Sequence, residues 1–229
     1  MRLNRTLLVA AMAAALLAGC KKNEEAAEVA APEQAAPAAE PAAQAEPAPA
    51  ATPEAAAPVA KAFDIEAVAV SDKPLGEWPY LVLPAGYELD NADDIARRSK
   101  DLARVPVWTG GELLWVEGRT FVDEIDNADG KTFSKFELRK GLQQAIETLG
   151  GVRIGERSFP QAVYKANEKA INDFTAEFSD MHNAYWYDND ADTWVIRRAD
   201  KAIWLVTDVN NDRGKVMVAE GPLPPPPAQ

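Results

Sequence analysis

The sequence contains one cysteine, Cys20, and one histidine, His182, in 229 residues. A single thiol cannot form a disulfide within the chain. A single imidazole excludes a histidine pair and a metal cluster built on histidines. Ser179 is the only hydroxyl near His182 that could serve as a nucleophile, and no other residue supports a Ser-His-Asp arrangement. We therefore expect no catalytic residues, no cofactor and no enzymatic activity, and we expect His182 to be structural or exposed.

Long apolar runs, phosphate-binding glycine loops and an excess of basic residues are also missing. The apolar run at residues 6–17 is about a dozen residues long, whereas a membrane-spanning helix needs roughly 20. Gly110-Gly111 and Gly150-Gly151 indicate a turn and a helix end. The chain has 24 Lys and Arg against 36 Asp and Glu, a formal charge of -12. This balance argues against nucleic acid as a partner.

The first twenty residues have the organisation of an export signal. Arg2 and Arg5 precede the apolar run, which ends in Leu17-Ala18-Gly19-Cys20. This stretch resembles the bacterial lipoprotein signal, in which the leader is cleaved before the cysteine. The resemblance implies that Cys20 carries acyl chains such as palmitate, which anchor the protein in the membrane. By the sorting rule of that class, Lys21 implies the outer membrane, with the domain facing the periplasm.

Composition divides the chain into four parts. Residues 1–19 form the leader, and residues 20–61 combine the lipidated cysteine with a tether of Ala, Pro and Glu that we expect to be disordered. Its prolines favour polyproline II, with a reach of up to roughly 120 Å. Residues 62–223 are long enough for one folded domain. Residues 224–229 form a Pro-rich tail, which we expect to be frayed.

The folded part is predicted to be an α+β domain. Strands are expected at residues 63–70, 78–83, 112–125, 152–154, 194–198, 202–209 and 215–220, and a loop at 91–104. The last three strands predict an antiparallel meander. Ser134 with Glu137, and Ser158 with Gln161, indicate two capped helices. We predict a mixed, mostly antiparallel sheet with both helices packed on one face.

One loop resembles half of a calcium site. Asp188, Asp190 and Asp192 place carboxylates at alternate positions, as in an EF-hand loop. The pattern then fails, because position six is Thr193 and position twelve is Ala199. We expect a solvated acidic turn here that binds calcium in the millimolar range at best. The aromatic residues near this loop could line a ligand groove, although core packing is the simpler interpretation; they are Tyr185, Trp186, Tyr187, Trp194 and Trp204.

Several stretches resemble a known envelope family, namely 83–87, 108–110, 134–137, 149–154, 194–200 and 203–204. They are similar to the domain that precedes the OmpA-like module in certain proteobacterial outer-membrane lipoproteins. The resemblance covers roughly residues 63–223, and its motifs are structural. In those relatives a Pro-rich hinge leads into a cell-wall-binding module, whereas this sequence ends at Gln229. We therefore expect no peptidoglycan binding by this chain.

These observations favour a non-enzymatic interaction module anchored to the outer membrane. We expect its partner to be another envelope protein. Two alternatives remain at this point, an envelope enzyme of unknown class and a calcium-stabilised ligand-binding domain. The residues that would bind a ligand are not indicated by the sequence.

Overall fold

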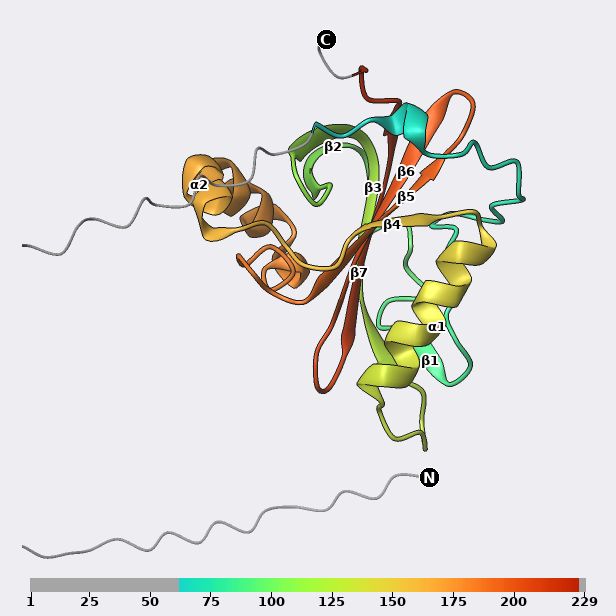
Figure 1. The fold of residues 1–229 in the computed structure, drawn as a ribbon. Helices are drawn as coiled ribbons and strands as arrows, with labels where there is room; N and C mark the ends of the chain where they lie inside the picture. Colours follow the sequence, from blue (N-terminus) through green and yellow to red (C-terminus); the bar gives the residue numbers. More distant parts are fainter. Residues whose placement is uncertain (1–61, 227–229) are drawn as a thin grey trace, which may run out of the picture. The chain divides into compact units, whose positions relative to one another are not determined.

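The computed structural model describes residues 62–226, and these form an α+β domain, as predicted. Cys20 and the proposed tether lie outside the described residues. Seven strands form one sheet, and two α-helices pack against it (Figure 1). No helix in the described part of the chain is long and apolar enough to cross a bilayer.

The sheet is antiparallel throughout its named strands, in the order β1-β3-β7-β6-β5-β4, with β2 also paired to β3. A single parallel bridge joins Val70 to Arg197 outside these strands. The longest strand, β3, pairs with β2 through its first half and with β1 through its end. The strands are β1 (Tyr87–Leu89), β2 (Ser99–Trp108), β3 (Leu113–Asn127), β4 (Val152–Gly155), β5 (Ala191–Arg197), β6 (Lys201–Val209) and β7 (Gly214–Pro222).

Three expectations about the strands need correction. Residues 63–70 contain a 3-10 helix, η1 (Ile65–Ala67), in place of a strand. Residues 78–83 form no strand. Their apolar residues Leu81 and Leu83 pack against the hydrophobic core beside α1 and do not belong to the sheet. The expected loop at 91–104 ends earlier than predicted, because residues 99–104 belong to β2, whose polar first half is held by its ladder with β3. The C-terminal meander of β5, β6 and β7 is confirmed.

Helix α1 (Lys135–Thr148) forms as the sequence predicts. The Ser134 hydroxyl accepts a hydrogen bond from the Glu137 backbone N–H at 3.3 Å, which satisfies one of the free donors of the first turn. Leu138, Leu142 and Ile146 are buried along one stripe. Gly150 ends the helix at φ 85°, a left-handed conformation that disfavours other residues.

Helix α2 (Gln161–Glu177) begins differently from the prediction. Ser158 is not its cap, because the cap position is Pro160 and no side chain there makes a hydrogen bond. The Ser158 hydroxyl instead donates to the Trp186 carbonyl and accepts from the Asn189 backbone N–H at 3.0 Å. Ser158 therefore fixes the loop at residues 183–190 against the start of α2.

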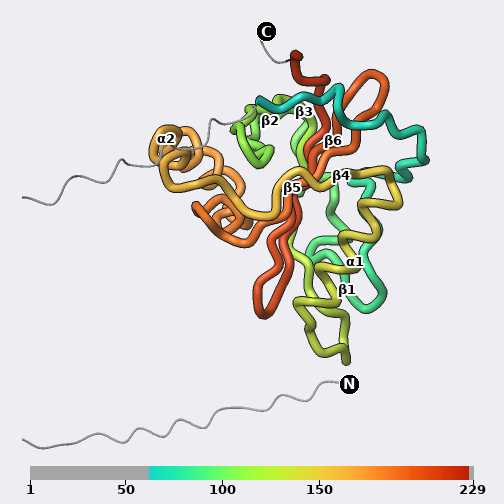
Figure 2. Tube along the Cα trace, in the orientation of Figure 1, coloured from blue at the N-terminus to red at the C-terminus, as the bar shows by residue number. Residues whose placement is uncertain are grey.

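The two helices lie on opposite faces of the sheet, so the prediction that both pack on one face is wrong (Figures 1 and 2). Phe174 of α2 packs in one buried cluster with Trp204 of β6, whereas Leu142 of α1 packs in the other with Leu205. We term these clusters the α2 core and the α1 core. Because β6 is apolar on both faces, each face needs its own cover.

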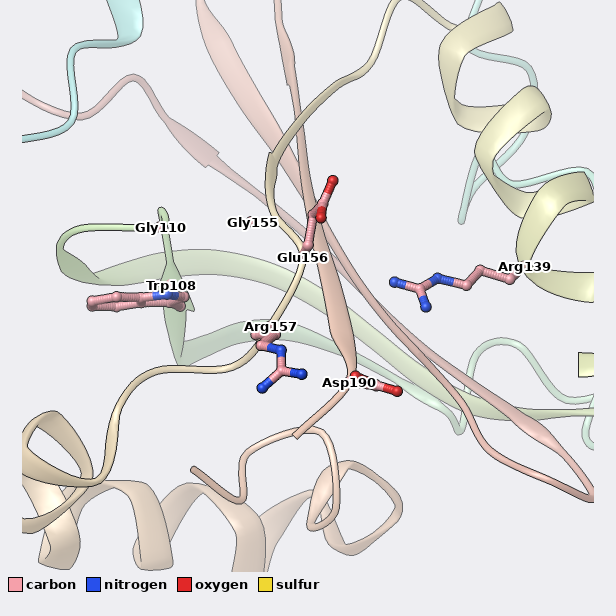
Figure 3. A pocket seen from close by; sticks show the side chains of 7 residues that line it. All are labelled: Trp108, Gly110, Arg139, Gly155, Glu156, Arg157 and Asp190. Atoms are coloured by element: carbon pink, nitrogen blue, oxygen red, sulfur yellow. The ribbon is translucent and has the colours of Figure 1, made fainter. Parts of the chain in front are cut away.

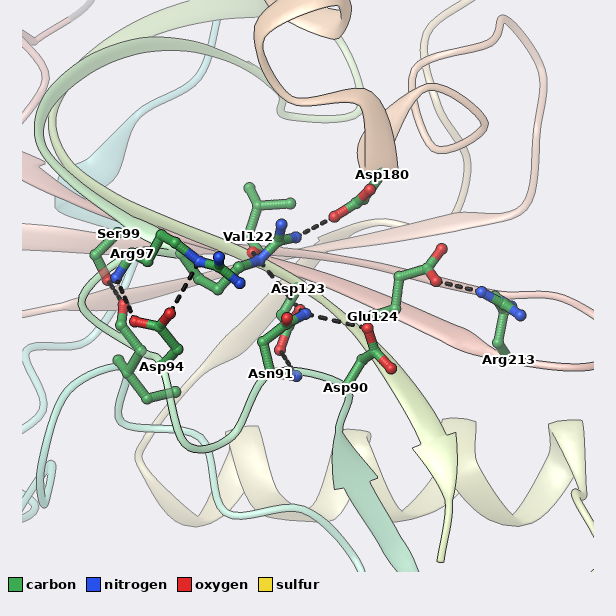
Figure 4. A network of polar contacts seen from close by, with 12 residues as sticks. Asp90, Asn91, Asp94, Arg97, Ser99, Val122, Asp123, Glu124, Asp180 and Arg213 are labelled. Atoms are coloured by element: carbon green, nitrogen blue, oxygen red, sulfur yellow. Dashed lines mark hydrogen bonds and ion pairs between the residues drawn. The ribbon is translucent and has the colours of Figure 1, made fainter. Parts of the chain in front are cut away.

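A buried carboxylate ties the curved part of β3 to the segment before β2 (Figure 4). Asp123 is 0% exposed, and its Oδ1 lies 3.2 Å from the Arg98 Nε atom. The Asn91 side-chain amide and backbone N–H donate to its two oxygens at 2.8 and 3.0 Å. Arg98 also forms an ion pair with Asp180, which belongs to the 3-10 helix η2 (Ser179–Met181). These contacts fix the position of Asp123 between β3 and the segment before β2.

Candidate ligand-binding cleft

A cavity of about 460 Å³ opens at the side of the sheet where β2, β4 and α1 approach one another. We term it the Arg157 cleft, and its lining residues come from four separate segments of the chain (Figure 3). They are Trp108, Gly110, Arg139, Gly155, Glu156, Arg157 and Asp190.

The turn between β2 and β3 brings Trp108 into this cleft. Gly110 has φ 87°, and a Cβ atom at this position would lie 2.6 Å from the carbonyl oxygen of Ile154. Only glycine therefore allows this turn to approach β4 so closely. Behind Trp108, the buried ring of Phe159 meets its ring edge-on, with centroids 6.4 Å apart. This contact fixes the Trp108 indole, which forms one side of the cleft.

Asp192, on the α1 face of the sheet, holds Arg139, which lines the cleft. Its side chain is 5% exposed and accepts two hydrogen bonds from Arg139, at 2.7 Å from Nε and 2.9 Å from Nη2. Arg153 of β4 adds a contact of 3.4 Å from Nη1. The bond to Asp192 raises the pKa of the Arg139 guanidinium, more than desolvation lowers it. The contacts with Asp192 therefore fix the guanidinium groups of both arginines.

The remaining acids around the cleft also have basic partners. Arg153 Nη2 lies 2.8 Å from Glu156 Oε1, and Lys135 Nζ lies 3.6 Å from Asp190 Oδ2. Arg157 is exposed and forms no ion pair or hydrogen bond with any side chain in residues 62–226. Figure 3 shows its guanidinium group between Trp108 and Asp190. The basic side chains in and beside the cleft therefore carry one positive charge more than the neighbouring acids neutralise; the bases are Lys135, Arg139, Arg153 and Arg157, and the acids are Glu156, Asp190 and Asp192.

The proposed calcium ligands are not brought together. Asp192 is occupied by two arginines, Asp190 pairs with Lys135, and Asp188 lies at a bend with φ 57°. Over residues 62–226, no group of three or more His, Cys, Asp or Glu could hold a metal ion. The alternation of carboxylates instead reflects the start of β5, which turns Asp192 toward α1.

The aromatic residues near this loop divide between core and surface. Trp194 is buried in the α1 core, and Trp204 and Tyr185 are buried in the α2 core. Trp186 remains 46% exposed and stacks on Tyr187 at 4.9 Å between ring centroids. His182 is exposed, and its ring also stacks on Trp186.

The residues of the Arg157 cleft were not indicated as a site by the sequence. Arg139 and Asp192 are 53 positions apart, and Arg153 and Asp192 are 39 apart. The only local signal is the run Arg153-Ile154-Gly155-Glu156-Arg157, which places charges at the end of a short strand. Comparison with known proteins adds no family: no family model matches the sequence, and no curated protein matches it.

Proposed function

We propose that this chain is a lipoprotein held in the outer membrane through Cys20, and that its periplasmic domain is a non-enzymatic module. The module binds an acidic segment of another envelope protein in the Arg157 cleft. The observation that carries this proposal is the exposed guanidinium of Arg157, which has no acidic partner in residues 62–226 although its neighbours are all paired.

The chemistry of the cleft favours a carboxylate. A guanidinium group presents two parallel N–H donors that match the two oxygens of a carboxylate. Trp108 supplies a flat apolar wall beside it for the aliphatic part of the same ligand. Arg139 and Arg153 already alternate with their acidic partners as neighbouring positive and negative charges. A carboxylate bound to Arg157 would give this arginine a negative partner as well.

The charge of the chain restricts the source of that carboxylate. At a formal charge of -12, the protein repels long anionic polymers. A short acidic peptide needs only the local positive charge of Arg157. This argument favours a protein segment over the carboxylate-rich cell wall. It also agrees with the resemblance to the domain that precedes an OmpA-like module.

The proposed lipid anchor at Cys20 and the proposed tether suit the same role. A tethered domain searches a confined volume, so that even a modest affinity suffices for frequent encounters. If the proposed tether at residues 20–61 were fully extended as polyproline II, the domain could reach up to roughly 120 Å from the membrane.

Replacement of Arg157 by Glu should weaken binding of a short peptide with two glutamates by roughly tenfold or more. The measurement is fluorescence anisotropy with the mature chain in detergent at about 150 mM salt, where distant charges are screened. The glutamine version of the peptide should not bind. Lys169→Glu is the matched control, because Lys169 lies on α2 with 89% of its side chain exposed.

Equal losses in the Arg157 and Lys169 variants would show non-specific electrostatics and contradict the proposal. A second contradiction would be pelleting of the chain with isolated sacculi and its release by soluble muropeptide, because the ligand would then be the cell wall.

A further inference from the structure

A second cavity lies beyond Asp190, near the start of α1 and the turn between β6 and β7. Its volume is about 240 Å³, and we term it the Asp208 pocket. It is lined by Lys135, Asn183, Trp186, Asp190, Asp208 and Asn210, among others.

Asp208 is the unusual member of this pocket. It is 2% exposed, and its Oδ2 atom has no hydrogen-bond partner in residues 62–226. The Oδ1 atom of Asn210, two residues along, is also buried without a partner there. A buried oxygen without a hydrogen bond is costly, so two in one pocket call for a donor that the fold does not supply.

The basic residues nearest to Asp208 are engaged elsewhere. Lys135 Nζ lies 3.6 Å from Asp190, and Lys215 Nζ, on the strand facing Asp208, lies 3.7 Å from Glu124. Neither forms an ion pair with Asp208. The pocket is lined by two carboxylates, Asp190 and Asp208, and by one basic side chain, Lys135. Its lining therefore has one negative charge in excess.

We infer that the Asp208 pocket binds a primary ammonium group, held by Asp208, the side-chain oxygen of Asn210 and the ring of Trp186. An ammonium group has three donors, which matches two unpartnered oxygens and a nearby carboxylate. The exposed ring of Trp186 offers a face for the same cation, and its stacking on Tyr187 fixes its position. The ligand is opposite in charge to that of the Arg157 cleft, so this inference goes beyond the proposed function.

The protonation of Asp208 agrees with this inference. Burial raises the pKa of the Asp208 carboxyl, Lys215 and Lys135 oppose the shift, and Asp190 adds to it. Because the folded-state pKa lies above the unfolded one, this group favours the folded state at low pH. That contribution is lost as the pH rises through the folded pKa. An ammonium ligand should offset the loss, and its affinity should fall when acid protonates Asp208.

The test is an NMR titration of the mature chain in detergent with butylammonium chloride, following the indole N–H of Trp186 and the side-chain amide of Asn210. We expect saturable shifts at neutral pH and none with butanol, which has the same shape without the charge. Asp208→Asn should weaken binding by roughly tenfold or more. This variant should fold, because it removes a buried charge. Lys169→Glu, at an exposed position of α2 that lines neither cavity, should leave ammonium binding unchanged, which shows that the loss in Asp208→Asn is not a general effect of charge.

Two further arms complete the experiment. A peptide with one lysine, compared with its acetylated form, distinguishes a polypeptide source of the ammonium from a small amine. The inference is overturned if butanol gives the same shifts or if Asp208→Asn binds butylammonium as well as the parent chain does. Binding that appears only in Lys135→Met would also overturn it, because Lys135 would then be the natural occupant.

Discussion

Replacement of Asp123 by Ala is expected to lower the free energy of unfolding by about 3–5 kcal/mol. The substitution removes a fully buried carboxylate that forms an ion pair with Arg98 and accepts hydrogen bonds from two donors of Asn91. Arg98, with 26% of its side chain exposed, would lose one of its two acids and keep Asp180. Urea denaturation followed by circular dichroism measures the change.

The control for this substitution is Asp94→Ala. Asp94 pairs with Arg97, but both side chains are exposed, at 42% and 73%. An exposed pair of this kind contributes about 0–1 kcal/mol. If the two variants lost the same stability, the Asp123 network would not hold β3 to the segment before β2.

Replacement of Cys20 by Ala should abolish fatty-acid labelling and leave the protein either unprocessed or released from the membrane. The proposed acyl chains would contribute about 0.8 kcal/mol for each buried methylene, so their loss would remove essentially the whole anchor. The measurement is metabolic labelling with a fatty-acid analogue, followed by fractionation of the envelope.

Lys21→Asp provides the matched control for the anchor. By the sorting rule of the lipoprotein class, this variant should keep its label but remain in the inner membrane. An exported parent chain without label, or a Cys20→Ala chain that is still labelled, would contradict lipidation at Cys20.

The elements that sequence predicted well are those with complete local signals. Helix α1 has a capping serine, an apolar stripe and a terminal glycine, and each acts within a few residues. The meander of β5 to β7 combines apolar runs with polar turns. Strand β2 lacks such a signal, because its first half is polar and Leu102 is 75% exposed. Only the ladder with β3 makes this segment a strand.

The placement of the helices could not be read from their own sequences. An apolar stripe such as Leu138, Leu142 and Ile146 fits either face of a sheet equally well. The informative residues lie in the strands, because Trp204 and Leu205 are adjacent and both fully buried. A central strand that is apolar on both faces requires cover on both sides.

The candidate cleft could be predicted from the sequence even less than the placement of the helices, because its residues are brought together only by the fold. Arg139, Asp192 and Arg157 come from α1, β5 and the segment after β4, and no short motif joins them. Asp192 illustrates the difficulty, since the same residue suggested a calcium ligand in sequence and is an arginine partner in the structure. Side-chain direction at the start of β5 decides between the two.

The central claim, that the domain binds an envelope protein through the Arg157 cleft, is tested most directly by photo-crosslinking in intact envelopes. A photoreactive residue replaces Glu156, which has 69% of its side chain exposed beside Arg157, and Lys169 on α2 serves as the control position. We expect one protein adduct at residue 156 that maps to an acidic segment, is absent at residue 169 and disappears when Arg157→Glu is added. Equal adducts at both positions, or an adduct at residue 156 that persists in the Arg157→Glu chain, would contradict it.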